Sequence, residues 1–167
     1  MCNPTAQDYF SSERRDDPGI RDSDRLLRHL CVPVQIRQVE QTGALRISDQ
    51  AFTHRKSDCG VSVDLECLLH HAGLTEEQRR GVMPNSFAMI AVTASNARNF
   101  SEGVAWTPKP HEPNLSGYSA QDNEFHGEII TPISRSEGRK LATTAQLIWT
   151  KGELDLGPYN GQLPDIG

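Results

Sequence analysis

The chain has 167 residues, of which 36% are hydrophobic and 23% are charged, with a formal net charge of -5. This length predicts one domain with one hydrophobic core, and the acidic balance does not favour a nucleic-acid partner, which would need a basic face. The sequence contains no apolar run of membrane-spanning length and no basic, apolar leader, so we expect a cytoplasmic protein without a membrane segment.

The two ends of the chain differ in composition from its middle. Residues 1–24 carry many charged and few apolar side chains, a composition that cannot bury enough surface to offset the loss of chain entropy. Residues 153–167 are rich in glycine and proline. We therefore expect a flexible arm over 1–24, a globular domain over 25–152 and an extended tail over 153–167.

The first ordered elements are predicted between residues 24 and 48. Ser23 and Asp24 are capping residues that precede an apolar pair, which predicts a helix beginning near Asp24. Residues 31–36 favour a strand, and Pro33 would confine it to a sheet edge or a strand end because proline lacks the amide hydrogen. The alternation over 44–48 predicts a half-buried strand.

The middle of the chain predicts strands and short helices in alternation. Residues 61–63 favour a strand, and the apolar spacing that follows predicts a short helix from Asp64. A second short helix is predicted over 74–80, where a threonine cap precedes acidic residues. Residues 87–94 form the most hydrophobic run of the chain and are predicted to be the central strand.

The last third of the domain contains the longest predicted loop. A helical turn over 95–100 and a short strand over 104–108 lead into a loop over 108–123 that is rich in proline, glycine and asparagine. Loops of this length are frequently functional. A strand over 125–130 follows it.

The final predicted helix covers residues 134–149, where Leu141, Ala145 and Ile148 recur on one side. Alternating strands and helices with short turns predict an α+β fold. We expect a single mixed domain with a small, largely antiparallel sheet, short helices packed on that sheet, and flexible arms at both ends.

Acidic and basic side chains concentrate where the long loop enters the strand at 125–130. Residues i and i+2 of a strand share a face, so Glu124, His126 and Glu128 are expected to point one way, and Phe125 the other. The flanking carboxylates would favour the protonated form of His126, which would make it a usable proton carrier. A hydrogen-bonded histidine with a structural role is the alternative.

Metal chemistry is not predicted. The H-x-E pattern at 126–128 matches part of the zinc-deaminase site, but the required P-C-x-x-C does not follow it. A zinc cluster of Cys59, Cys67, His70 and His71 lacks paired C-x-x-C spacing. The chain's widely spaced cysteines are expected to remain thiols, and the motifs of serine hydrolases, P-loop proteins and zincins are absent from the sequence.

The order of four polar residues along the chain nevertheless suggests an enzyme. Arg28 and His29 come early, Ser62 lies in a predicted strand, and Glu128 lies in a late strand after a long loop. This order resembles that of the ADP-ribosyltransferase superfamily. The resemblance implies that Arg28 or His29 binds NAD, that Ser62 organises the pocket, and that Glu128 stabilises positive charge on the ribose, with His126 where many members have Gln or Glu.

A non-catalytic binding protein or small subunit is the alternative function. The arm over 1–24 and the tail over 153–167 could lie along a protein partner as extended peptides. In that case Arg28 and His29 bind a helix end, Ser62 is an ordinary strand residue, and the two glutamates are solvated charges of the strand face. The sequence does not decide whether the protein is an enzyme.

Overall fold

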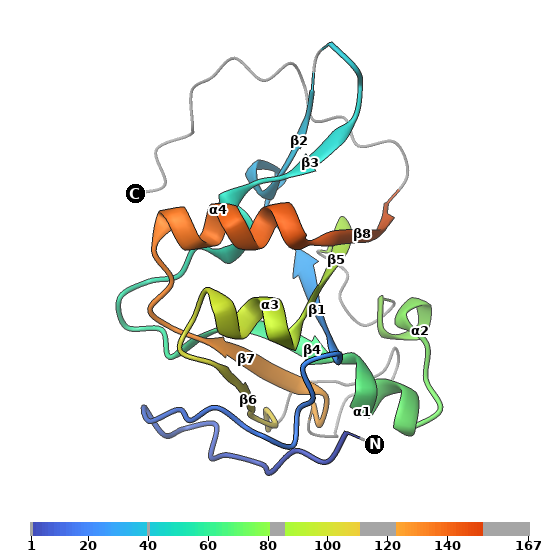
Figure 1. Cartoon of the computed structure of the whole chain (residues 1–167). Coiled ribbons are helices and arrows are strands. Elements are labelled where there is room, and N and C mark those ends of the chain that lie inside the picture. Colours follow the sequence, from blue (N-terminus) through green and yellow to red (C-terminus); the bar gives the residue numbers. More distant parts are fainter. Residues whose placement is uncertain (1, 40, 81–85, 111–122, 152–167) are drawn as a thin grey trace.

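The computed structural model describes residues 2–39, 41–80, 86–110 and 123–151. They form a six-stranded antiparallel sheet with the order β6-β7-β4-β1-β5-β8 and a separate two-stranded sheet, β2-β3 (Figure 1). The strands are β1 Arg25–Leu30, β2 Ile36–Gln38, β3 Leu45–Ile47, β4 Gly60–Leu65, β5 Ala88–Thr93, β6 Val104–Trp106, β7 His126–Ile130 and β8 Gln146–Thr150. The helices are η1 Pro33–Gln35, η2 Asp49–Phe52, α1 Glu66–His71, α2 Glu76–Arg80, α3 Ala94–Asn99 and α4 Arg135–Thr144. The predicted α+β class, with one domain, an antiparallel sheet and short helices, is confirmed.

One face of the sheet carries the larger hydrophobic core. Alternate residues of β1 and β4, including Leu26, Leu30 and Val63, pack there with Phe52 of η2 and Leu141 of α4. All five of these side chains are buried. Helices α3 and α4 lie over this face (Figure 1).

The opposite face is divided between a small apolar cluster and a polar region. Leu27, Met89 and Phe125 form the cluster with Leu69 of α1. The rest of this face belongs to β4 and β7, where Ser62 is paired in register with Glu128, and Asp64 with His126. These four side chains are polar.

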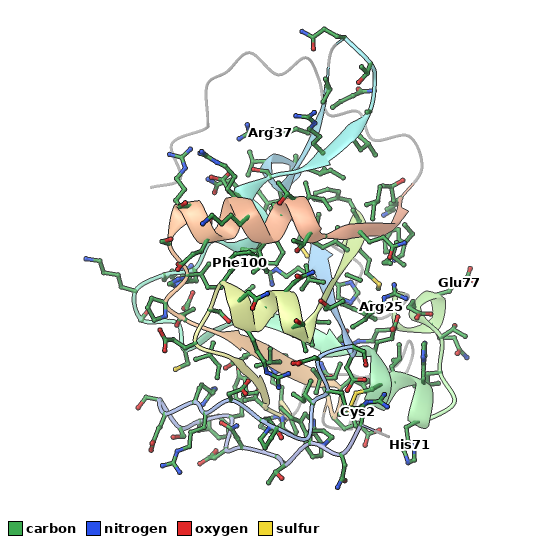
Figure 2. The ribbon with its side chains drawn as sticks, viewed as in Figure 1. Cys2, Arg25, Arg37, His71, Glu77 and Phe100 are labelled. Atoms are coloured by element: carbon green, nitrogen blue, oxygen red, sulfur yellow. A yellow bond between two sulfur atoms is a disulfide. The ribbon has the colours of Figure 1, made fainter. Side chains whose placement is uncertain are left out.

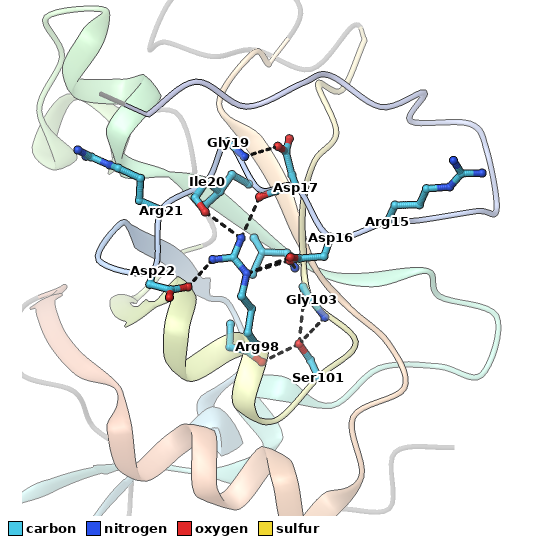
Figure 3. A network of polar contacts seen from close by, with 12 residues as sticks. Arg15, Asp16, Asp17, Gly19, Ile20, Arg21, Asp22, Arg98, Ser101 and Gly103 are labelled. Carbon is cyan, nitrogen blue, oxygen red and sulfur yellow. Dashed lines mark hydrogen bonds and ion pairs between the residues drawn. The ribbon is translucent and has the colours of Figure 1, made fainter.

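The N-terminal arm runs along this sheet beside β6 and β7 (Figure 1). Residues 2–24 contain no helix or strand, but Ile20 and Asp17 are buried. Arg98 of α3 donates hydrogen bonds to Asp16 and Asp22 and to two arm carbonyls (Figure 3). Charged residues thus fix the arm through ion pairs, a form of attachment that its composition did not predict.

The helix predicted from Asp24 is wrong, because residues 25–30 form β1. This strand pairs with β4 on one side and β5 on the other, so Leu26 and Leu27 are buried on opposite faces. Only Leu26, Leu27 and Leu30 of this strand are apolar, and their spacing fits one side of a helix as well as the two faces of a strand. The strand predicted over 31–36 is also wrong, since Pro33 begins the short helix η1, a position that favours proline.

The helix predicted over 134–149 is correct only as far as Thr144. The hydroxyls of Thr143 and Thr144 donate to carbonyls of the preceding turn, and Ala145 takes an extended conformation. Residues 146–150 then pair with β5 and form an edge of the sheet. The strand predicted over 87–94 is present as β5, but β1 and β4 occupy the centre.

The strands and short helices predicted at 44–48, 61–63, 74–80, 95–100 and 104–108 are all present. Residues 111–122 of the predicted loop and the predicted tail at 153–167 lie outside the described residues. No helix among the described residues is long and apolar enough to cross a membrane.

Candidate functional site

A polar pocket lies where β1 and β4 separate. The two strands share only two register pairs, Leu26 with Leu65 and Leu27 with Asp64, and a pocket of about 360 Å³ is lined by residues of both strands. It brings together four of the residues that the sequence singled out, Arg28, His29, Ser62 and His126. The other described lining residues are Cys31, Val32, Gln35, Val63, Asp64, Arg79, Lys109 and Asn123.

Arg28 spans the gap between the two strands. Its Nε donates to the carbonyl oxygen of Ala51 at 2.9 Å, and its Nη1 donates to that of Ser62 at 2.8 Å. Desolvation lowers the pKa of Arg28 to about 10, so the guanidinium remains charged at neutral pH. Among the described residues no carboxylate pairs with it.

Asp64 is the buried acid of the pocket. Arg79 of α2 donates to it through Nε at 2.6 Å and Nη2 at 3.1 Å, and Nε2 of His29 lies 3.2 Å from its Oδ2. Burial acts to raise the pKa of Asp64, but the hydrogen bond from His29 and the charge of Arg79 outweigh burial and hold the pKa well below its ordinary value. The charge of Asp64 is therefore balanced within the protein.

His126 begins β7 with its side chain buried. Its Nδ1 donates to the carbonyl oxygen of Thr107 at 2.8 Å and lies 3.1 Å from the hydroxyl of the same residue. Because a carbonyl only accepts, this contact places a proton on Nδ1. In the neutral ring Nε2 is then the nitrogen that can take up a proton.

Glu128 lies beside the pocket but is not one of its lining residues. It is paired in register with Ser62 on β4, on the same face of β7 as His126. The Nε of Arg14 donates to its Oε2 at 2.5 Å, and the two side chains are only 4% and 8% exposed. An arginine from the N-terminal arm thus binds the carboxylate that the sequence predicted to be catalytic.

Glu124 does not share the face of His126 and Glu128, so that part of the prediction is wrong. It lies exposed in the turn before β7. The turn is closed by Asn123, whose side chain accepts from the amide of Phe125 and whose carbonyl accepts from that of His126. The strand alternation therefore starts at His126, and Phe125 packs with Leu27 on the polar side of the sheet.

The prediction that all cysteines are thiols is wrong for one pair. Cys2 and Cys67 form a disulfide with a Cα–Cα distance of 5.9 Å, and Figure 2 shows Cys2 beside α1. The arm brings together two residues that are 65 positions apart, which spacing alone could not indicate. Cys31 and Cys59 are thiols.

A second cluster of ionisable groups joins α1 to α2. One carboxylate oxygen each of Glu66 and Glu76 and one ring nitrogen of His70 all lie within 4.8 Å of one another. His70 Nε2 is 2.8 Å from Glu76 Oε1, and Arg25 Nη1 is 3.1 Å from Glu66 Oε1. The ion pair with Arg25 does not satisfy the cluster fully, since Glu66 Oε1 and Arg25 Nε are buried without a hydrogen bond among the described residues. Burial, followed by the hydrogen bond with Glu76, raises the pKa of Glu66 to about 7 from 4.5.

This shift predicts a pH dependence of stability. An acid with a raised pKa holds its proton in the folded chain after the unfolded chain has lost it, so between pH 4.5 and 7 its contribution to stability falls as the pH rises. We expect Glu66→Gln to melt at a higher temperature than the unmodified chain at pH 8 and to have no advantage at pH 4.5. Exposed Glu102 provides the control variant, Glu102→Gln. Equal melting of Glu66→Gln and the unmodified chain at pH 8 would contradict the assignment.

Comparison with protein-family models, curated proteins and solved structures gives no significant match. The likeness to ADP-ribosyltransferases therefore rests on the order of Arg28, His29, Ser62 and Glu128 in this chain.

Proposed function

We propose that the pocket between β1 and β4 binds an anionic small molecule through Arg28. The observation that carries this proposal is a half-buried guanidinium that lines a pocket and has no carboxylate partner among the described residues. Arg79 is already matched by Asp64, and Lys109 adds a further positive charge to the lining. Arg28 already donates two hydrogen bonds to carbonyl oxygens, and a ligand phosphate would add the counter-charge that these carbonyls do not supply.

The specific reaction that we propose is transfer of the ADP-ribosyl group from NAD. In this reaction the bond between the nicotinamide nitrogen and ribose C1′ breaks, nicotinamide leaves with the electron pair, and an acceptor bonds to C1′ and loses a proton. Arg28 would hold the diphosphate. His126 would accept the proton at Nε2, and Glu128 would stabilise the positive charge that develops on the ribose.

The convergence of Arg28, His29, Ser62 and His126 in one pocket supports this reading. The register pair between Ser62 and Glu128 supports it further, because opposite residues in an antiparallel pair have neighbouring side chains. The competing structural explanation is that Arg28 serves only to join β1 to η2 and to β4 through the carbonyl oxygens of Ala51 and Ser62. Ligand binding separates these explanations.

Arg28→Ala is expected to weaken binding of pyrophosphate, ADP-ribose and NAD at least about tenfold, because a hydrogen bond to a charged group is removed. Isothermal titration at low and moderate salt measures this change. The control is Arg46→Ala, which removes an exposed arginine of β3. Equal affinities for Arg28→Ala and the unmodified chain would contradict the proposed anion site.

The transfer reaction has its own readout. Incubation of the chain with labelled NAD and a cell lysate follows both consumption of NAD and labelling of acceptors. Consumption that is lost in Arg28→Ala supports the transferase. Tight binding of ADP-ribose without consumption of NAD would leave an anion-binding protein and remove the transferase.

A protein partner that docks on the N-terminal arm is a second candidate function. Phe10 is 79% exposed, the highest value among the exposed large hydrophobic side chains of the described residues. An aromatic ring left in water on an ordered segment is a typical anchor for a partner. The tail at 153–167, which we propose as a second docking segment, lies outside the described residues.

A further inference from the structure

The N-terminal arm contains a closed loop, residues 8–15, which we name the strap. The side chain of Gln7 joins its two ends, since Gln7 Oε1 accepts from the amide of Arg15 at 3.1 Å and Gln7 Nε2 donates to the carbonyl of Arg15 at 2.6 Å. The amide of Gln7 also donates to the carbonyl of Trp106 on β6 at 2.9 Å. Surface loops of this length whose ends lie close together form compact units that are frequently functional.

The other end of the strap is fixed just as firmly. Asp16 accepts from the amide of Val104 at 2.8 Å, and the amide of Asp17 donates to the carbonyl of Val104 at 2.8 Å. Arg98 adds ion pairs to Asp16 and Asp22 (Figure 3). The arm is therefore anchored on both sides of the strap by contacts that do not involve the strap itself.

Arg14 is the main attachment between the strap and the polar face. Its Nε donates to Glu128, while its Nη2 donates to the carbonyl of Tyr9 at 2.9 Å and its Nη1 to that of Ser11. One guanidinium thus binds the strap to itself and to β7. The side chain of Glu128 is almost completely covered in this arrangement.

Tyr9 provides the second attachment. Its ring meets the ring of His126 edge-on, with centroids 5.6 Å apart, and Nζ of Lys109 lies 5.7 Å from the centroid of the Tyr9 ring. Both partners line the pocket. No residue of the strap is fully buried, and Phe10 at its tip is exposed, so few apolar contacts hold the strap down.

We propose that the strap is an autoinhibitory cover, which masks Glu128 in the resting chain and opens to add this carboxylate to the wall of the pocket. The part of this inference that concerns inhibition rests on the proposed function, because it requires Glu128 to act in the transfer reaction. Its structural basis is independent: Glu128 faces Ser62 in register, and its carboxylate is paired with Arg14 of the strap while its side chain is 8% exposed. Without Arg14, the carboxylate would be buried without a counter-charge, which favours opening of the strap.

The covering of Glu128 is tested by carbodiimide-driven coupling of glycine ethyl ester to carboxylates, mapped by mass spectrometry on the full chain. In the unmodified chain Glu128 is expected to react at least fivefold more slowly than exposed Glu124. In Arg14→Ala the two rates are expected to become similar. Equal rates in the unmodified chain, or a Glu128 that stays protected in Arg14→Ala, would overturn the proposal.

Two further variants control the measurement. Arg15→Ala removes a neighbouring exposed arginine whose side chain bonds only to Glu13 among the described residues, and it is expected to leave Glu128 protected. Arg14→Lys keeps the charge and is expected to restore part of the protection. Unfolding of each variant is followed alongside, and Arg14→Lys decides the question if Arg14→Ala does not fold.

Turnover of labelled NAD tests the inhibition. An open strap should raise turnover about tenfold in Arg14→Ala, because activity scales with the fraction of chains that are open. Unchanged turnover with Glu128 exposed would overturn autoinhibition. Absence of turnover in every variant, with Glu128 unmasked in Arg14→Ala, would instead remove the transferase and leave the strap as a cover.

Discussion

Replacing Asp64 by alanine is expected to lower the free energy of unfolding by about 3–5 kcal/mol. Asp64 and Arg79 are 3% and 1% exposed, and their bidentate contact lies within the polar face of the sheet. Removal of the carboxylate takes away the acceptor for Nε and Nη2 of the buried Arg79 and the negative charge beside its guanidinium. Nε2 of His29 loses its contact with Asp64 in the same step, while its Nδ1 keeps the contact with Ser86. Urea unfolding of the variant at neutral pH measures the loss.

The matched control for Asp64→Ala is Glu13→Gln. Glu13 is also paired with an arginine, but both side chains of that pair are more than half exposed, so the change should lie within about 0.5 kcal/mol of zero. Replacing both Asp64 and Arg79 by apolar residues should cost less than the sum of the two single changes, because no charge is left alone. An Asp64→Ala chain as stable as the control would contradict the buried pair.

The pH dependence of this pair has the opposite sign to that of Glu66. The pKa of Asp64 is depressed in the folded chain, so its contribution is fully present above the ordinary value of 3.8 and is lost as the pH falls below that value. Asp64→Ala removes this contribution. The difference in stability between the variant and the unmodified chain should therefore shrink on acidification.

The fold could be predicted where a segment has one buried face and a clear boundary. Strand β4 and helix α1 meet near Asp64 as the sequence predicts, because the apolar period changes there from two to nearly four. Strands β1 and β8 could not be predicted in this way. Leu26 and Leu27 fit either a helix or a doubly buried strand, and residues 146–150 extend a helical pattern until pairing with β5 overrides it.

The site could be predicted in part. Arg28, His29, Ser62 and His126 do line one pocket, although the sequence offered only their order. Asp64 had a usable signal, since it stands two residues after Ser62 on the same face of a strand.

Other site residues left no local signal in the sequence. Arg79 reaches the pocket from α2, and Arg14 reaches Glu128 from 114 positions away. Such pairs depend on the tertiary fold, and no short pattern encodes them.

Replacing Gly60 by alanine is expected to destabilise the protein by about 1–3 kcal/mol, the usual cost of overpacking. A Cβ at this position would lie 2.5 Å from Cβ of Glu128 and 3.0 Å from the carbonyl oxygen of Ile129. Both atoms belong to β7 and are close to its backbone, so neither can move aside cheaply. Thermal and urea unfolding measure the effect.

Gly138 supplies a control with the opposite expected sign. It lies in α4, where an added Cβ meets no atom closer than 3.5 Å, and alanine in a helix should add about 0.5–1 kcal/mol. If both variants changed stability in the same direction, close approach at Gly60 would not be the cause. The comparison separates loss of glycine as such from the contact with Glu128.

The same contact links stability to the site. Because Gly60 has no side chain, β7 can approach β4 closely enough for Glu128 to stand opposite Ser62 at the edge of the pocket. Gly60→Ala should push the carboxylate away from β4 and loosen its ion pair with Arg14. We therefore expect faster carbodiimide labelling of Glu128 in Gly60→Ala than in Gly138→Ala, which follows if one steric contact both packs the sheet and positions the masked carboxylate.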